Sequence, residues 1–181
     1  IHIDLHQQYE TDEESIFELT DKTVITSIYK PRKKFTHKGI YGHAALISGS
    51  YGMMGAAVLA AKACLKSGAG KLTCFIPECG YNILQTTVPE AMCKASGEKF
   101  ILSANEIEKF DAVGIGPGIG LYPTHASLLK EVFTASAKPI LIDADALNMI
   151  AQNKELLSLI PPASIITPHP TEFERLFGKT A

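Results

Sequence analysis

Several common sequence features are missing from this chain, and each absence excludes a class of protein. No apolar run approaches the roughly 20 residues that a membrane helix needs, so we expect no membrane partner. No positively charged start is followed by an apolar segment, so we expect no secretory signal. The pattern Gly-x-x-x-x-Gly-Lys-Ser/Thr does not occur, which excludes a P-loop.

Cysteine pairs and an excess of charge are also missing. The four cysteines include no Cys-x-x-Cys pair and no histidine at metal-ligand spacing, so we expect reduced thiols in a cytoplasmic protein. The net charge of −2 gives no broad basic surface, so we expect no nucleic-acid partner. A chain of 181 residues that is 46% hydrophobic can form one sizeable domain with its own core.

The stretch from His43 to Gly70 organises the rest of the chain. It begins with a short apolar run and continues through the glycine turn Gly49-Ser-Tyr-Gly-Met-Met-Gly55 into an alanine-rich segment. This pattern predicts a buried strand, a tight loop and a helix that begins near Gly55 and ends before Gly68. The first N–H groups of such a helix have no partner within it and favour an anionic or strongly polar ligand group.

Strands and helices are predicted to alternate along the chain. The predicted strands are His43–Ser48, Lys71–Ile76, Glu90–Lys94, Ala112–Gly116, Pro139–Asp143 and Ser164–Thr167. The predicted helices are Gly55–Ser67, Cys79–Thr87, Ala104–Phe110, Pro123–Ser136, Ala144–Gln152 and Pro170–Phe177. Strands that are apolar without period-two alternation are typical of a parallel sheet covered on both faces, so we predict an α/β fold with a mostly parallel sheet.

Four loops of unusual composition follow predicted strands: Gly49–Gly55, Pro117–Gly120, Asp143–Asn148 and Thr167–Glu172. Ligands of open parallel sheets bind beyond the carboxyl ends of the strands, so we expect these loops to form one site. The glycine loop also admits a Rossmann dinucleotide site, with Glu78 after the second strand as the ribose ligand, or a purely structural turn.

Charged and polar side chains in these loops are the candidate site residues. A helix N-cap explains one of Asp143 and Asp145 but not both, and the second acid could hold magnesium through water or orient a ligand hydroxyl. His169 stands between two prolines that hold the backbone extended, and Glu172 follows at the third position of a helix. Lys38 stands beside glycines, and its ammonium is suited to bind a phosphate.

The chain resembles the NAD(P)H-hydrate dehydratase family, which has a ribokinase-like, three-layer α/β/α fold. The resemblance rests on His37-Lys-Gly-x-Tyr-Gly-His43, Gly49-Ser-x-x-x-x-Gly-Ala-Ala57, Gly116-Pro-Gly118, Asp143-Ala-Asp-Ala-Leu-Asn148 and Thr167-Pro-His-Pro-x-Glu-Phe173. Five motifs in the family's order cover about residues 35 to 178. Residues 35–181 therefore resemble the N-terminal part of such a domain, and residues 1–34 resemble the connector that follows a fused epimerase domain.

The resemblance implies repair of hydrated NADH or NADPH, driven by ADP or ATP with Mg²⁺, in an enzyme that forms a homo-oligomer, commonly a tetramer. It implies that the hydrated cofactor contacts Ala56, Gly118, His169 and Glu172. It places Lys38, Gly55, Asp143, Asp145 and Asn148 near the transferred phosphate or the nucleotide and assigns no residue to the metal.

The chain departs from the family pattern in one respect. It contains no Gly-x-Gly-Asp turn, whose aspartate is the family's catalytic base, so we expect that base beyond residue 181 and expect the chain alone to be inactive. The predicted sheet would be incomplete on its C-terminal side, with an open edge that favours association. A vitamin-precursor kinase of the same fold and a non-catalytic nucleotide-binding module are the alternatives.

Overall fold

The computed structural model describes residues 20–29 and 31–179, and the chain divides into two units, residues 1–36 and 37–181. The first unit contains helix α2 (Lys22–Ile28), which was not predicted from the sequence. Asp21 begins this helix, because its carboxylate accepts hydrogen bonds from the N–H groups of Thr23 at 2.8 Å and Val24 at 3.1 Å. Much of the predicted connector, residues 1–19 and 30, lies outside the described residues.

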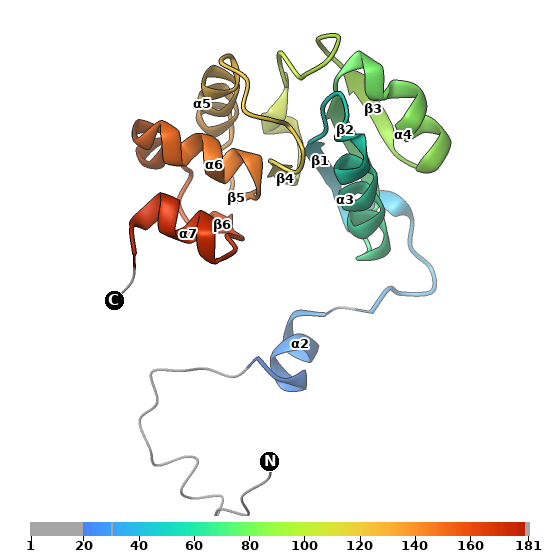
Figure 1. The fold of residues 1–181 in the computed structure, drawn as a ribbon. Helices are drawn as coiled ribbons and strands as arrows, with labels where there is room; N and C mark the ends of the chain where they lie inside the picture. Colours follow the sequence, from blue (N-terminus) through green and yellow to red (C-terminus); the bar gives the residue numbers. More distant parts are fainter. Residues whose placement is uncertain (1–19, 30, 180–181) are drawn as a thin grey trace, which may run out of the picture. The chain divides into compact units, whose positions relative to one another are not determined.

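The second unit is built on a six-stranded parallel sheet in the order β3-β2-β1-β4-β5-β6 (Figure 1). Its strands are β1 (His43–Ile47), β2 (Lys71–Ile76), β3 (Met92–Ala95), β4 (Ala112–Ile115), β5 (Ile140–Ile142) and β6 (Ile165–Ile166). All six lie within or beside the apolar runs that predicted them. The prediction of an α/β fold with a parallel sheet is confirmed.

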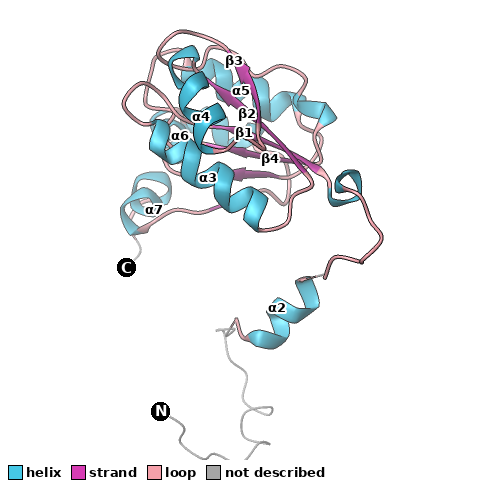
Figure 2. Cartoon of the chain, turned by 90° about the vertical axis from the view of Figure 1, so that its right-hand side faces the viewer, coloured by secondary structure: helices cyan, strands magenta, loops and turns pink. Residues whose placement is uncertain are grey.

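Helices cover both faces of this sheet, with α3 and α4 on one side and α5 and α6 on the other (Figures 1 and 2). The helices of the second unit are α3 (Met54–Lys66), α4 (Tyr81–Thr87), α5 (His125–Ala135), α6 (Asp145–Gln152) and α7 (Pro170–Phe177). Short 3₁₀ helices span Lys38–Tyr41, Glu78–Gly80, Ile107–Lys109 and Lys154–Leu159. Within residues 20–29 and 31–179, no helix combines the length and the apolar character that crossing a bilayer requires.

The core is divided into two apolar clusters by the sheet itself. Strand β1 supplies both, because Leu46 packs with α3 and α4 while Ile47 packs with α5 and α6. Ala57 and Ala61 of α3 are fully buried, and their small side chains let the helix lie close to the sheet. Full burial of one leucine or isoleucine, such as Ile47, contributes roughly 1.5–3 kcal/mol.

Two local expectations differ from the structure. The segment Ala104–Phe110, predicted to be a helix, forms only the 3₁₀ turn Ile107–Lys109, and the left-handed backbone of Glu106 (φ 64°) precedes it. The 3₁₀ helix Lys154–Leu159 was not predicted, although Leu156 within it is buried against α5 and α6. Both turns serve tertiary packing, which local sequence periodicity does not record.

The sheet face beside α3 is left partly bare over β4, β5 and β6. Leu141 of β5 and Ile165 of β6 are 43% and 60% exposed. A hollow of about 390 Å³ lies on this face, and its lining includes Ala63 and Cys64 of α3 together with Gly114 of β4. Strand β6 pairs only with β5, so it forms one edge of the sheet as the structure describes it.

Candidate functional site

The loops that follow β1 and β4 are joined by direct hydrogen bonds. The Gly49 N–H donates to the Pro117 carbonyl at 2.9 Å, and the Ser50 hydroxyl donates to the Gly118 carbonyl at 2.8 Å. Ser50 is fully buried, so its hydroxyl fixes the two loops rather than facing solvent. These loops lie where the strand order reverses, which is where open α/β sheets bind ligands.

Gly118 fits against the first turn of α3 only because it has no side chain. Its backbone is left-handed (φ 67°), and a Cβ at this position would come within 2.9 Å of both the Ala56 Cβ and the Met53 carbonyl oxygen. The structure therefore brings Gly118 beside Ala56, the two residues that the resemblance assigned to the same ligand.

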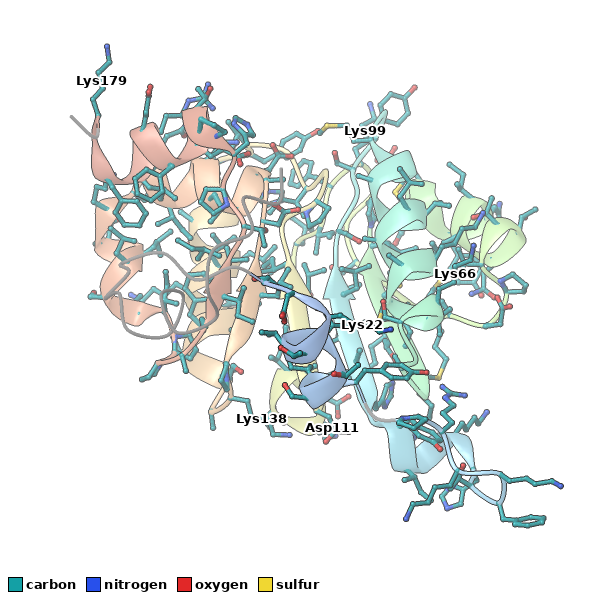
Figure 3. The ribbon with its side chains drawn as sticks, turned by 90° about the horizontal axis from the view of Figure 1, so that it is seen from below. Lys22, Lys66, Lys99, Asp111, Lys138 and Lys179 are labelled. Atoms are coloured by element: carbon teal, nitrogen blue, oxygen red, sulfur yellow. The ribbon has the colours of Figure 1, made fainter. Side chains whose placement is uncertain are left out.

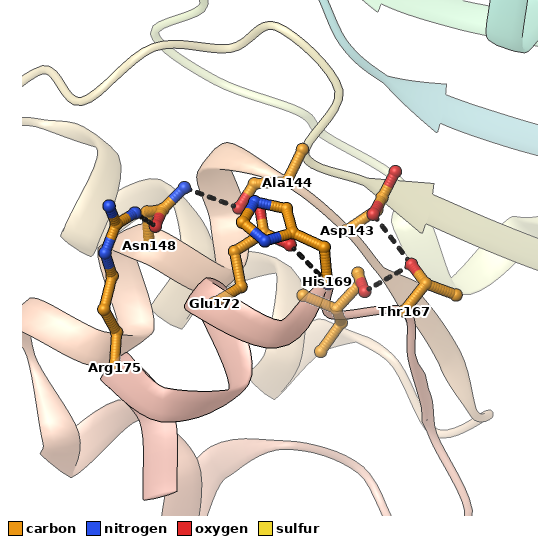
Figure 4. Close-up of polar contacts among 8 residues, drawn as sticks. Asp143, Ala144, Asn148, Thr167, His169, Glu172 and Arg175 are labelled. Atoms are coloured by element: carbon orange, nitrogen blue, oxygen red, sulfur yellow. Dashed lines mark hydrogen bonds and ion pairs between the residues drawn. The ribbon is translucent and has the colours of Figure 1, made fainter. Parts of the chain in front are cut away.

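Asp143 and Asp145 each connect the loop after β5 to a different neighbour. The Asp145 carboxylate accepts a hydrogen bond from the Gly120 N–H at 2.9 Å. The Asp143 carboxylate accepts one from the Thr167 hydroxyl at 2.8 Å, as Figure 4 shows. Neither acid caps α6, whose first turn has no side-chain cap. The N-cap explanation for one of the two acids is therefore wrong.

Ala144, between the two acids, has a backbone conformation that L-residues rarely adopt, with φ 50° and ψ −120°. Such conformations cost about 1–3 kcal/mol and persist where surrounding contacts hold them. The contacts here are the hydrogen bonds of Asp143 and Asp145, together with Asn148, whose amide donates to the Ala144 carbonyl at 3.3 Å. The strain lies in the loop that would face a ligand.

The buried carboxylate of Glu172 holds His169 in place at the start of α7. The Glu172 carboxylate accepts the His169 backbone N–H at 3.0 Å, and its other oxygen lies 3.4 Å from the imidazole Nε2 (Figure 4). The side chain of Glu172 is 7% exposed and that of His169 is 59% exposed. Glu172 therefore orients the imidazole, and His169 presents it to solvent and to any ligand at this edge.

Arg175 joins α7 to α6 and was not identified from the sequence. Its guanidinium donates to the Asn148 side-chain oxygen at 2.6 Å (Figure 4). This bond connects Asn148, at the phosphate side of the predicted site, to the helix that carries His169. Ser50 and Thr167 were part of the sequence motifs, but their bridging roles were not predicted, since each depends on a residue 68 or 24 positions away.

Lys38, predicted to lie near the phosphate or nucleotide, is not brought together with the other predicted site residues within this chain. It begins a 3₁₀ helix that leads into β1, and its carbonyl lies against Gly70, just before β2. Both positions are at the amino ends of the strands, so the length of β1 separates Lys38 from the loops. The same edge holds Asp111, whose carboxylate accepts the His43 N–H at 2.9 Å and lies 3.5 Å from the Lys138 ammonium (Figure 3).

Metal ligands are sparse in the part of the chain that the structure describes. No group of three or more His, Cys, Asp or Glu side chains is placed to hold an ion among residues 20–29 and 31–179. Asp143 and Asp145 each have one carboxylate oxygen outside the hydrogen bonds given above. That donor set fits Mg²⁺ that is held mainly by nucleotide phosphates and water, since such ions need only one or two protein carboxylates.

The fold and the joined loops define a doubly wound, ribokinase-like α/β protein whose strand-end loops meet at the carboxyl edge of the sheet. A ribokinase-like protein of Enterococcus faecalis superposes with a TM-score of 0.76 at 26% identity, covering 91% of this chain and 59% of that one. The chain belongs to the NAD(P)H-hydrate dehydratase family, whose model matches residues 44–181. This match confirms the resemblance found in the sequence.

Individual relatives agree with this assignment. An ADP-dependent (S)-NAD(P)H-hydrate dehydratase of Streptococcus pneumoniae is 33% identical over 88% of this chain and 55% of its own length. A bifunctional NAD(P)H-hydrate repair enzyme of Moorella thermoacetica is 36% identical over 83% of this chain and 30% of its own length. A Bacillus subtilis ADP/ATP-dependent NAD(P)H-hydrate dehydratase, co-crystallised with ATP and Mg²⁺, superposes with a TM-score of 0.62 at 28% identity, covering 82% of this chain and 51% of that one. The chain thus spans about half or less of the curated relatives it matches.

Proposed function

We propose that this chain is part of an enzyme that repairs nicotinamide cofactors, by nucleotide-dependent dehydration of hydrated NADH or NADPH. The observation that carries the proposal is the family match over residues 44–181, combined with the joining of four strand-end loops at one edge of the sheet. The names of the relatives supply the substrate and the dependence on ADP or ATP.

The proposed chemistry makes a poor leaving group into a good one. Hydroxide leaves the hydrated ring with difficulty. Transfer of a phosphoryl group to the ring hydroxyl releases the nucleotide product and a proton. The ring C–O bond then breaks with phosphate as the leaving group, and a proton from the neighbouring ring carbon is lost as the double bond re-forms. Such catalysis depends on positioning and on stabilisation of phosphate charge.

Each group of site residues has a proposed part in this reaction. The hydrated ring would lie against Ala56 and Gly118, which the left-handed backbone of Gly118 brings side by side. His169, oriented by Glu172, would donate a hydrogen bond to the ring's substituents. The first turn of α3 near Gly55 would face phosphate oxygens, because its N–H groups lack a side-chain cap.

The phosphate to be transferred would lie between the loop after β5 and α6, near Asp143, Asp145 and Asn148. Mg²⁺ supplies charge stabilisation at phosphate oxygens when it is bound. Asp143 and Asp145 are the residues of this chain that would hold it, through water as well as directly. Because both carboxylates are anchored to neighbouring loops, they would meet the metal with little reorganisation.

The remaining assignments are also proposals. Residues 35–181 would be the N-terminal part of the dehydratase domain, and residues 1–34 would be the connector from a fused epimerase domain. The catalytic base would come from a Gly-x-Gly-Asp turn, which this sequence does not contain. We further propose a cytoplasmic homo-oligomer, such as a tetramer.

A coupled assay on the complete enzyme tests the function. Hydrated NADH with Mg²⁺ and either ADP or ATP should regain the absorbance of NADH and release phosphate. A stable phosphorylated alcohol without dehydration would instead assign a small-alcohol kinase. Cofactor binding without any turnover in the complete enzyme would assign a non-catalytic nucleotide-binding module.

A further inference from the structure

A separate hollow opens beside the glycine loop, at the carboxyl ends of β1 and β2. It has a volume of about 340 Å³, and most of its lining is apolar. The lining residues are Tyr51, Gly52, Met54, Gly55, Cys79 and Ile83. The volume is at the lower end of the range for small-molecule sites, enough for one ring system with its sugar.

An aromatic ring is held beside this hollow although it faces solvent. Tyr51 is 66% exposed, yet its backbone N–H donates to the Lys99 carbonyl at 2.7 Å, and the Lys99 ammonium lies 5.6 Å from its ring centroid. Lys99 lies at the end of the sheet opposite Asp111 and Lys138 (Figure 3). An exposed tyrosine fixed in this way offers a face for stacking, and nucleic-acid bases stack on such faces.

Gly55 leaves the backbone of α3 open at the same place. It is an exposed residue in the first turn of the helix, where alanine would be more stabilising. A Cβ on Gly55 would meet no atom within 4 Å, so packing within residues 37–179 does not require the glycine there. A glycine at such a position lets a ligand approach the backbone closely.

The strand order determines which part of a ligand would reach this hollow. Dinucleotides bind across the point where the order of a doubly wound sheet reverses, here between β1 and β4. Gly118 and His169 lie on the β4–β6 side of that point, and the hollow lies on the β2 side. Adjacent strands are about 4.8 Å apart, so β2 and β6 are about 19 Å apart, a span suited to an extended dinucleotide.

We propose that the hollow beside Tyr51 and Gly55 binds the adenine end of the hydrated dinucleotide, with the ring stacked on Tyr51, while the nicotinamide end lies by Gly118 and His169. This inference rests on the proposed function and assigns an orientation to its substrate. Adenine is also present in the phosphoryl donor, so the test separates the two sources.

Calorimetry on the complete enzyme compares two ligands, NADH hydrate and the hydrate of reduced nicotinamide mononucleotide, which lacks the adenosine half. The unmodified enzyme should bind NADH hydrate at least tenfold more tightly than the mononucleotide. Tyr51→Ala should weaken NADH hydrate binding about tenfold, the effect of losing one ring stack, and leave mononucleotide binding unchanged. Gly55→Leu, which places a side chain in the hollow, should likewise weaken NADH hydrate binding and leave mononucleotide binding unchanged. ADP affinity should not change in Tyr51→Ala.

Ala63→Leu is the matched control, because it adds a leucine to the same helix in the hollow on the bare sheet face. It should leave both hydrates unaffected. Equal weakening of both hydrates by Tyr51→Ala, no weakening of either, or a loss confined to ADP would overturn the proposed orientation and leave the proposed function standing. Failure of the unmodified complete enzyme to bind either hydrate would instead overturn the proposed function, and the orientation with it.

Discussion

Gly118 and Ala56, which are 62 positions apart in the sequence, lie so close that a Cβ on Gly118 would come within 2.9 Å of the Ala56 Cβ. We therefore expect Gly118→Ala to destabilise the fold by about 1–3 kcal/mol, through overpacking and a strained positive φ. Urea unfolding measures this loss. Calorimetry should show that NADH hydrate binds at least tenfold more weakly, because the loop after β4 must move away from α3.

Gly52→Ala is the stability control for that variant. Gly52 has a similar positive φ of 83°, but a Cβ there would meet no atom within 4 Å. Gly52→Ala should be destabilised only by the backbone strain, by about 1 kcal/mol. If both variants unfold at the same urea concentration, the contact between Gly118 and Ala56 does not limit stability.

Replacing Ala144 should raise stability and weaken binding together. Ala144→Gly removes the penalty of φ 50°, so we expect a gain of about 1 kcal/mol, measured by urea unfolding. The same change releases the loop that fixes Asp143 and Asp145, so NADH hydrate or nucleotide binding should fall.

Ala163→Gly is matched to this change, since Ala163 also has a positive φ, of 61°, and lies in a turn before β6. It should stabilise the chain by a similar amount without changing ligand affinity. Weaker binding in both glycine variants would indicate a general loosening rather than a role for the Asp143 loop.

Two substitutions of Asp145 separate its structural role from its charge. Asp145→Ala leaves the buried Gly120 N–H without its acceptor and should destabilise the fold by about 1–3 kcal/mol. Asp145→Asn retains an oxygen acceptor, so its stability should stay near that of the unmodified chain. In the complete enzyme both variants should lower turnover, because both remove the carboxylate charge; full activity in Asp145→Asn would contradict a role at phosphate or Mg²⁺.

Stability should fall as the pH is lowered below about 6.5, the ordinary pKa of histidine. Burial, followed by the nearby Lys71 ammonium, lowers the pKa of His43, whose Nε2 lies 2.8 Å from the Thr73 hydroxyl. The unfolded chain therefore binds a proton at this residue before the folded chain does, and the contribution to stability is present above pH 6.5 and lost on acidification.

NMR titration should show a pKa for His43 below the ordinary value for histidine. The free energy of unfolding, measured with urea at a series of pH values, should fall as the pH is lowered through the same range. His43→Gln retains a polar contact to Thr73 without titrating, so its stability should depend less on pH in this range. An unchanged pH dependence in His43→Gln would assign the effect to other groups.

The sequence predicted the strands and the site loops well because their signals are local. Each buried strand is a short apolar run, and each site loop combines glycine, proline or acids directly after such a run. Since all the strands are parallel, placing one loop at the carboxyl edge places all of them there. Gly118, Asp145 and Thr167 are indeed hydrogen-bonded to their neighbouring loops at that edge.

Long-range contacts account for the parts that were missed. The hydrogen bonds from Ser50 to Gly118 and from Arg175 to Asn148 join residues 68 and 27 positions apart, and neither leaves a periodic pattern. Lys38 was grouped with the site loops because its neighbouring glycines resemble a ligand loop, whereas it precedes β1 and lies at the amino edge of the sheet. Helix α2 was also missed. Asp21 is a residue type that commonly begins helices, but α2 is only seven residues long and gives too short a periodic pattern to predict.

The bare sheet face over β4 to β6 bears on how unfolding of this chain is measured. Leu141 and Ile165 already present apolar surface in the folded state, beside a hollow of about 390 Å³. Dyes such as ANS, which fluoresce when bound to apolar surface, should therefore fluoresce in the presence of the folded chain. ANS fluorescence alone would therefore not distinguish a molten state of this chain from its folded state. Circular dichroism should be used to follow unfolding instead.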